Sequence, residues 1–286
     1  MKLSLGTVQF GMDYGINNPR GKIPKEEVFE ILEEAEKNGI DTLDTAYAYG
    51  DSEKVIGEYL KNTKSHLKVI SKLPPCEVEK TEAFFHTSLQ NLQTDSIYGY
   101  LLHDFGKYPE NVKKLEVLGN LKAGNKIQKI GFSLYYPKEL EYLIENKISI
   151  DIIQIPHNLF DQRFSIYFPL LKEAGIEIHV RSVFLQGLFF KNPQELKGNL
   201  TRAREKLLSL RALSKETNIP VEALSLNFAV LNNFVDRVII GIDTIANLRD
   251  NVKALQYQGK IEEIYDRLVQ LKEDDENIIV PVNWKR

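Results

Sequence analysis

The chain alternates between two patterns of hydrophobic and polar residues. Short runs rich in Val, Ile and Leu are typical of strands buried on both faces, and longer charged segments with apolar residues every three or four positions are typical of amphipathic helices. Gly or Asn closes several of the helical segments directly before the next apolar run, as at Asn38-Gly39, Ala174-Gly175 and Thr217-Asn218. This is a common way for a helix to end. The pattern therefore predicts strands and helices in alternation.

The predicted strands are Leu3–Thr7, Thr42–Asp44, Leu67–Lys72, Ile97–His103, Lys129–Ser133, Ile152–Pro156, Glu177–Ser182 and Arg237–Gly241. The predicted helices are Glu26–Asn38, Ser52–Leu60, Glu79–Leu92, Val112–Ala123, Pro137–Asn146, Phe168–Ala174, Arg204–Thr217 and Leu248–Gln258, with further helices at Pro220–Leu231 and Ile261–Glu273. Eight strands alternating with helices indicate an α/β fold of the (β/α)8 TIM barrel type, with extra helices near the C-terminus. No linker or composition shift interrupts residues 1–286, so a single domain is expected.

Composition and charge narrow the class of protein. Of the 286 residues, 43% are hydrophobic and 27% charged, and the net charge is −3, which suits a large core under a mixed surface. The sequence has no basic stripe of the kind that would indicate nucleic acid or an anionic membrane as a partner. No apolar stretch is long enough to span a bilayer, and the first residues carry no signal-peptide core, so a cytoplasmic protein is expected. Cys76 is the only cysteine, and no metal site is expected.

Polar residues follow several of the predicted strands where each one ends. Asp44 closes one strand, Lys72 another and His103 a third. In a barrel of this type the chemistry lies at the C-terminal ends of the strands, so these side chains are expected to meet at one mouth. After Asp44 comes the turn Thr45-Ala46-Tyr47-Ala48-Tyr49-Gly50, and Ser52 is expected to cap the following helix. A tyrosine there becomes a useful acid near neutral pH if a neighbouring cation lowers its pKa.

These residues carry a resemblance to a known family. The motif D-T-A-x-x-Y-G-x-S-E is matched from Asp44 to Glu53, and with Lys72 and His103 it resembles the aldo-keto reductases. That resemblance implies an Asp44, Tyr49, Lys72, His103 tetrad and an NAD(P)H-dependent oxidoreductase that reduces an aldehyde or ketone to an alcohol. Tyr49 would be the general acid, since the family spacing selects it over Tyr47.

The resemblance also implies the roles of the other three residues. Lys72 would lower the pKa of Tyr49, Asp44 would keep Lys72 charged and oriented, and His103 would orient the carbonyl oxygen. The substrate would be a small carbonyl compound, and the loops that follow the strands suit both a hydroxylated or sugar-like compound and a simple aldehyde. Those loops are Asp13–Lys22, Asp104–Gly106, His157–Arg163 and Phe184–Asn199. The oligomeric state is left open.

No G-x-G-x-x-G loop follows a strand, so a Rossmann cofactor site is not supported. The resemblance instead implies an extended cofactor across the barrel mouth. Its expected contacts are Gly6, Thr7, Asp44, Ser133, Gln154, Arg181, Ser182, Gln186, Gly187, Gly241, Asp243, Asn247 and Asn251.

Several of the expected contacts depart from the family pattern. Arg181 stands where many members have an aromatic residue that stacks on the nicotinamide, so it either stacks there, contacts substrate or phosphate, or is a surface charge. Gly241, Ile242 and Asn247 lack the cations that commonly bind a 2′-phosphate, and Asp243 adds a negative charge. NADPH is therefore expected from the family, with NADH as the alternative.

Two other functions stay open at this point. Lys72 could form a Schiff base, which would make the protein an aldolase-type lyase. The chain could also be a cofactor-binding regulatory subunit that keeps the tetrad and turns over slowly.

Overall fold

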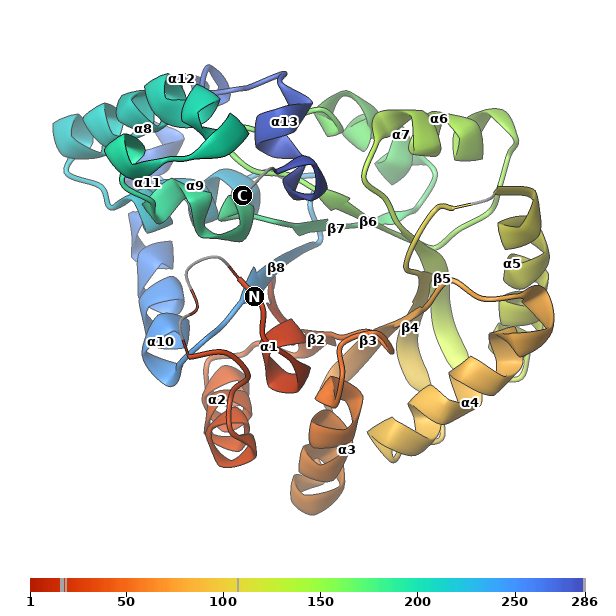
Figure 1. The fold of residues 1–286 in the computed structure, drawn as a ribbon. Helices are drawn as coiled ribbons and strands as arrows, with labels where there is room; N and C mark the ends of the chain where they lie inside the picture. The colour runs from red at the N-terminus through yellow and green to blue at the C-terminus, as the bar shows by residue number, and fades with distance from the viewer. Residues whose placement is uncertain (16–17, 19, 107, 285–286) are drawn as a thin grey trace.

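The computed structural model describes residues 1–15, 18, 20–106 and 108–284, and within them eight parallel strands close into a barrel in the order β1 to β8. Helices surround the barrel, as Figure 1 shows, and those of the C-terminal third gather on one side of it. The predicted (β/α)8 TIM barrel is confirmed, and a strand lies at every predicted position.

The strands are β1 (Leu3–Gly6), β2 (Thr42–Asp44), β3 (Lys68–Leu73), β4 (Ile97–Leu102), β5 (Ile127–Ser133), β6 (Ile152–Pro156), β7 (Glu177–Arg181) and β8 (Arg237–Gly241). The helices are α1 (Val8–Gly11), α2 (Lys25–Lys37), α3 (Ser52–Thr63), α4 (Thr81–Leu92), α5 (Tyr108–Ala123), α6 (Pro137–Glu145), α7 (Phe168–Glu173), α8 (Arg204–Thr217), α9 (Val221–Val230), α10 (Ile245–Ala254), α11 (Gln258–Glu262), α12 (Tyr265–Val269) and α13 (Glu276–Ile279).

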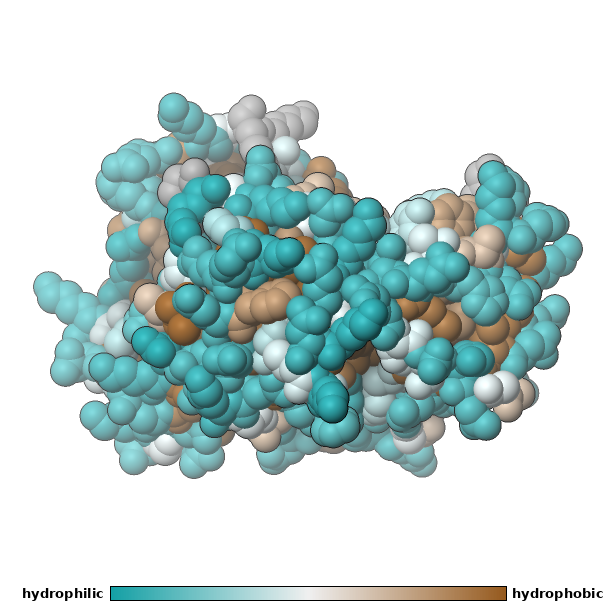
Figure 2. Space-filling view, turned by 90° about the horizontal axis from the view of Figure 1, so that it is seen from below, coloured by the Kyte–Doolittle hydropathy of each residue, from teal (hydrophilic) through white to brown (hydrophobic). Residues whose placement is uncertain are grey.

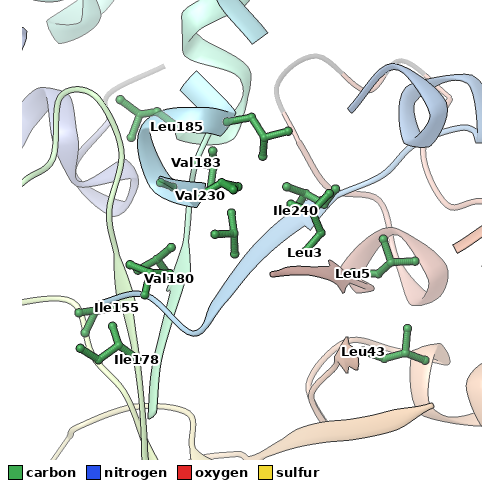
Figure 3. Packing of buried hydrophobic residues seen from close by; sticks show 14 of the residues in the cluster. Leu3, Leu5, Leu43, Ile155, Ile178, Val180, Val183, Leu185, Val230 and Ile240 are labelled. Carbon is green, nitrogen blue, oxygen red and sulfur yellow. The ribbon is translucent and has the colours of Figure 1, made fainter. Parts of the chain in front are cut away.

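The main core lies between the barrel and the helices around it. Leu3, Leu5 and Leu43 are fully buried, and Figure 3 shows them near Ile240 at one part of this layer. Side chains alternate along a strand, so the neighbours of these residues face the barrel axis instead. On β3, for example, Ser71 points outward and donates to Glu53 of α3, 2.6 Å away. Its neighbour Lys72 therefore belongs to the inward-facing set.

The inward-facing side chains of the barrel form two layers, an apolar floor and, above it at the C-terminal ends of the strands, a polar layer. Ile70, Leu101 and Ile152 are fully buried and form a small cluster of their own. Each lies two residues before a polar position, namely Lys72, His103 and Gln154. Because side chains with the same spacing share a face, the cluster lies directly below the polar layer. The floor holds the polar layer at the C-terminal ends of the strands.

One predicted helix is wrong as a continuous element. The segment Ile261–Glu273 divides into α11 and α12, and Ile264, with φ −116°, stands at the start of α12. Packing explains the break: the Tyr265 hydroxyl donates to Phe228 O at 3.0 Å, and the two rings stack at 5.3 Å. Tertiary contacts with α9 thus override the local helical periodicity.

The chain from α12 onward covers the segment that follows β6. Glu273 N donates to Phe160 O at 2.9 Å, and Arg163 pairs with Glu276 at 3.0 Å. Beneath this cover Phe160 is fully buried. The expected substrate loop His157–Arg163 is therefore part of the protein interior.

The outer surface offers no apolar belt in the view of Figure 2, which is mostly hydrophilic with separate apolar spots. Among the helices that the structure describes, none combines the length and apolar character needed to cross a membrane.

His157 is an unusual member of the interior. It is 1% exposed, and in the described part of the chain neither ring nitrogen has a hydrogen-bond partner. The ring packs between Phe168 and Phe228, with centroids 5.2 and 5.1 Å away. Burial lowers the pKa of His157 from 6.5 to about 4. Stability gained from the neutral ring is therefore present above pH 6.5 and lost as the pH falls towards 4.

We expect His157→Phe to make the protein less sensitive to acid. Between pH 6.5 and pH 4 the wild type should lose up to about 3 kcal/mol more unfolding free energy than the variant, since one pKa unit is worth about 1.4 kcal/mol. Urea unfolding at a series of pH values measures this difference. The exposed His66, replaced by Gln, is the matched control. Parallel pH profiles for wild type and His157→Phe would show that protonation of His157 does not limit acid stability.

Candidate active site

A cavity of about 780 Å³ opens at the C-terminal ends of the strands. This volume is in the range of small-molecule and cofactor sites. Of the predicted site residues, those that line it are Gly6, Thr7, Asp44, Tyr49, His103, Ser133, Gln154, Arg181, Ser182, Gln186, Gly187, Gly241, Asp243, Asn247 and Asn251. Lys72 is the exception, because it is fully buried below the cavity wall.

The barrel register explains why these residues meet. Gly6 is level with Asp44 on one side and with Gly241 on the other. Ser133 is level with Gln154 in the same way. Each is the last or nearly the last inward-facing residue of its strand, so closing the barrel brings them to one rim.

A turn after β2 carries Tyr49 into the cavity. The backbone of this turn packs directly on α1: a Cβ on Gly11 would lie 1.7 Å from Tyr49 O, and a Cβ on Gly50 would lie 2.4 Å from Gly11 O. Gly50 also has φ +57°, a left-handed conformation that favours glycine. Two glycines therefore let the chain approach closely enough to place Tyr49.

Ser52 fixes the same turn, though not as the expected helix cap. Its hydroxyl donates to Thr7, with Oγ 2.8 Å from Thr7 Oγ1, and Thr45 Oγ1 lies 3.0 Å from Ser52 Oγ. Asp51 stands at the N-cap position, with no side-chain cap bond. The prediction for Ser52 is therefore wrong: its side chain bonds to the end of β1, which ties the Tyr49 turn to the first strand.

Asp44 is bonded to two other residues of the polar layer. Its Oδ2 accepts from Lys72 Nζ at 2.7 Å, and its Oδ1 accepts from Gln154 Nε2 at 2.7 Å. Lys72 also donates to Thr45 O at 2.8 Å. Burial lowers the pKa of Lys72, and the Asp44 carboxylate opposes this effect. The ammonium group is thus held by β2 and is turned away from the cavity.

Tyr49 lies over this pair. Lys72 Nζ is 5.0 Å from the Tyr49 ring centroid, and the His103 ring meets Tyr49 edge-to-face at 5.6 Å. Burial raises the pKa of Tyr49, Asp44 adds to the rise, and Arg181 opposes it. The expectation that a neighbouring lysine lowers this pKa is therefore not met. The reason is that burial and the Asp44 carboxylate both raise the pKa, and Lys72 gives its hydrogen bonds to Asp44 and Thr45 O.

His103 is neutral in this environment. Burial lowers its pKa to about 3, and the positive charges of Lys72 and Arg181 act in the same direction. Such a ring is a hydrogen-bond donor and acceptor over the whole neutral range. Tyr47, the rival to Tyr49, packs edge-to-face on Phe84 at 4.8 Å and is not part of the cavity wall.

The residues expected to contact an extended cofactor are distributed along the cavity. Gln154 gives its amide nitrogen to Asp44, which leaves Oε1 facing Ser133 at 3.5 Å. Further along, Gln9 Oε1 and Asp243 Oδ1 are buried acceptors without a partner among the described residues. The polar side chains of the wall, among them Ser133, Gln154, Asp243, Asn247 and Asn251, suit a ligand with several hydroxyl and amide groups, as a dinucleotide has.

Sequence reasoning missed several residues of the cavity wall, namely Val8, Gln9, Tyr135, Glu222 and Asp250. Most of these residues lie within two positions of a predicted contact, and that proximity in the sequence could have identified them. Val8 and Gln9 follow Thr7, Tyr135 follows Ser133 by two positions, and Asp250 precedes Asn251. Glu222, at the start of α9, has no predicted contact near it in the sequence. In the loop Asp13–Lys22, residues 16, 17 and 19 lie outside the described part of the chain; Tyr14 lines the cavity.

Arg249 lies on α10, two residues before the cavity residue Asn251, but its side chain is engaged elsewhere. Its guanidinium pairs with Glu34 of α2 at 3.0 Å, and it is not part of the cavity wall. In the described part of the chain no cluster of His, Cys, Asp and Glu has the arrangement of a metal site.

Comparison with known proteins agrees with this geometry. Residues 2–271 match the model of the Aldo/keto reductase family, so the chain belongs to that family. An uncharacterized oxidoreductase of Bacillus subtilis, YqkF, is 27% identical over 263 residues, which cover 84% of this chain and 85% of the relative.

Solved structures share the fold. The holo form of the aldo-keto reductase AKR11C1 from Bacillus halodurans has a TM-score of 0.78 at 22% identity, covering 97% of this chain and 95% of that one. An aldo/keto reductase from Klebsiella pneumoniae, in complex with NADP and acetate, has a TM-score of 0.72 at 20% identity, covering 94% and 91%.

The buried Asp44–Lys72 pair gives a testable consequence for stability. Lys72→Met should lower the unfolding free energy by about 3–5 kcal/mol, because it leaves the Asp44 carboxylate buried and uncompensated. Lys72→Met combined with Asp44→Leu should cost less than Lys72→Met alone. Denaturant unfolding of the two single variants and the double variant measures the coupling. Additive losses would mean that the pair does not stabilise the barrel top.

Proposed function

We propose that the chain works as one catalytic domain, an NAD(P)H-dependent reductase that converts an aldehyde or ketone to an alcohol. The observation that carries this proposal is the placement of Tyr49 and His103 side by side in the cavity, above the Asp44–Lys72 pair. When bound, the nicotinamide cofactor would supply the hydride. The protein then has to orient the carbonyl group and deliver one proton to its oxygen.

Tyr49 is the proposed proton donor. A phenol with its ordinary pKa of about 10 is protonated at neutral pH, so the Tyr49 hydroxyl has a proton to give. The neutral His103 ring would donate a second hydrogen bond to the same oxygen. Lys72 would act on the Tyr49 ring from below, so that its positive charge stabilises the phenolate as it forms. This arrangement favours reduction over alcohol oxidation, which needs the phenolate beforehand.

The geometry speaks against the lyase alternative. A Schiff-base lysine needs a lowered pKa and access to the substrate. Burial does lower the pKa of Lys72, but its amine is closed off from the cavity and donates to Asp44 and Thr45 O. A regulatory subunit with little turnover is distinguished by assay, since it would bind the cofactor and reduce no member of a carbonyl panel.

The first test removes the proposed proton. Tyr49→Phe should lower kcat by about a hundredfold or more, because general acid catalysis contributes at least that much. Its cofactor dissociation constant should stay close to that of the wild type. Tyr47→Phe is the matched control, since it removes the same hydroxyl from a ring outside the cavity wall. Loss of activity in Tyr47→Phe with full activity in Tyr49→Phe would reverse the assignment.

We propose that the cofactor preference is weak or favours NADH. The cavity wall at β8 and α10 carries the carboxylates of Asp243 and Asp250, and α9, which packs on α10, adds Glu222. Asp243 lines the cavity, and its carboxylate suits a ribose hydroxyl donor, as the acidic residue does in NAD-binding Rossmann folds. A 2′-phosphate would instead meet negative charge.

Dissociation constants for NADH and NADPH test this preference. Wild type should bind NADPH less than about tenfold more tightly than NADH, since a phosphate clamp of charge-assisted hydrogen bonds would exceed that. Asp243→Arg should shift the ratio towards NADPH by about tenfold or more. Asp274→Arg is the control for net charge, because Asp274 is 80% exposed. A wild type that binds NADPH a hundredfold more tightly would contradict the assignment.

A further inference from the structure

Arg181 is fixed in one orientation at the reactive part of the cavity. Its Nη2 donates to Leu134 O at 2.9 Å, and its Nη1 lies 3.3 Å from Ser182 Oγ. The guanidinium carbon is 4.2 Å from the centroid of the Tyr135 ring, so one face is covered by that ring. A guanidinium group has five N–H donors, and these contacts leave donors free for a ligand.

The charge of Arg181 has no acidic partner among the described residues. Arg181 is the only Arg or Lys in the described cavity wall, and no Asp or Glu of the described residues pairs with it. The nearest candidate in the same layer, Asp44, already binds Lys72 at 2.7 Å. Tyr49 and His103 are neutral by the argument above. The reactive part of the cavity therefore carries one net positive charge, and the carboxylates of the wall other than Asp44 lie on α9 and in the segment from β8 to α10.

We propose that Arg181 is a binding subsite for an anionic group of the substrate, so that the enzyme reduces carbonyl compounds that carry a carboxylate or a phosphate. This inference rests on the proposed function and narrows its substrate class. A half-buried guanidinium without a carboxylate partner gains most from an oxyanion, which accepts two parallel N–H donors. The fixed orientation on Tyr135 lowers the entropy cost of this contact.

The aromatic lining indicates which probes fit. Tyr14, Tyr135, Phe184 and Phe190 all line the cavity. We therefore choose 4-formylbenzoate and its methyl ester. The two compounds have the same aromatic ring and the same aldehyde group and differ only in the charge of the acid group. Glyceraldehyde 3-phosphate and glyceraldehyde form the second pair, so that a carboxylate preference is told apart from a phosphate preference.

The experiment compares kcat/KM within each pair. Wild type should prefer the anionic member of at least one pair by about tenfold or more, the worth of one charge-assisted hydrogen bond. Arg181→Met should lower that ratio at least tenfold. Arg181→Lys should lower it less, because lysine keeps the positive charge but loses the pair of parallel N–H donors of the guanidinium group. Arg249→Met removes an equal charge outside the cavity and is the matched control. Taking a ratio cancels any loss common to both substrates.

A binding measurement separates this inference from the proposed function. Calorimetric titration with 4-(hydroxymethyl)benzoate and its methyl ester, in the presence of cofactor, should show tighter binding of the acid in wild type and none of that preference in Arg181→Met. If no carbonyl compound is reduced but this preference is found, the reductase proposal fails and the anion site stands. If Arg181→Met leaves the ratios and the binding preference unchanged, or if wild type shows no preference, the anion site is overturned. A raised cofactor dissociation constant with unchanged ratios would assign Arg181 to the cofactor.

Discussion

The Asp44 carboxylate is the group on which the rest of the site depends. It ends β2, and its two oxygens bond to Lys72 on β3 and to Gln154 on β6. Two strands from different parts of the barrel are thereby fixed to a third at the rim. A buried ion pair costs desolvation and is a weak source of stability. Here its effect is positional, because it sets the amide orientation of Gln154 and the height of Lys72 under Tyr49 at the same time.

Burial and charge act on Tyr49 in a way that simple proximity would not suggest. A lysine close to a phenol is expected to lower its pKa, but at Tyr49 burial and the Asp44 carboxylate outweigh that effect and raise the pKa. A raised pKa makes a phenol a weaker acid. The proposed reduction therefore depends on Lys72, 5.0 Å from the Tyr49 ring centroid, to stabilise the phenolate as the proton moves to the carbonyl oxygen.

Much of the fold and site could be read from the sequence, and the exceptions share one cause. Several strands are short apolar runs whose last inward residue is polar, as Asp44, Lys72 and Gln154 are, so barrel closure dictates that these residues meet. The motif from Asp44 to Glu53 located Tyr49 in the same way. By contrast, the division of Ile261–Glu273, the bond from Ser52 to Thr7 and the presence of Glu222 in the cavity wall depend on which segments pack together. The spacing of residues within one segment does not indicate which distant segments will contact it.

The distribution of charge gives the cavity a polarity that links the two proposals. Arg181 is the one Arg or Lys in the described cavity wall and ends β7, and the carboxylates of Asp243, Asp250 and Glu222 lie in the loop after β8, on α10 and on α9. An extended cofactor with an unphosphorylated ribose meets the negative part without repulsion, and a substrate anion meets the positive part. In a cavity with low-dielectric walls such opposite charges orient ligands as well as bind them. The same electrostatics would therefore disfavour both a 2′-phosphate at one end and a cationic substrate at the other.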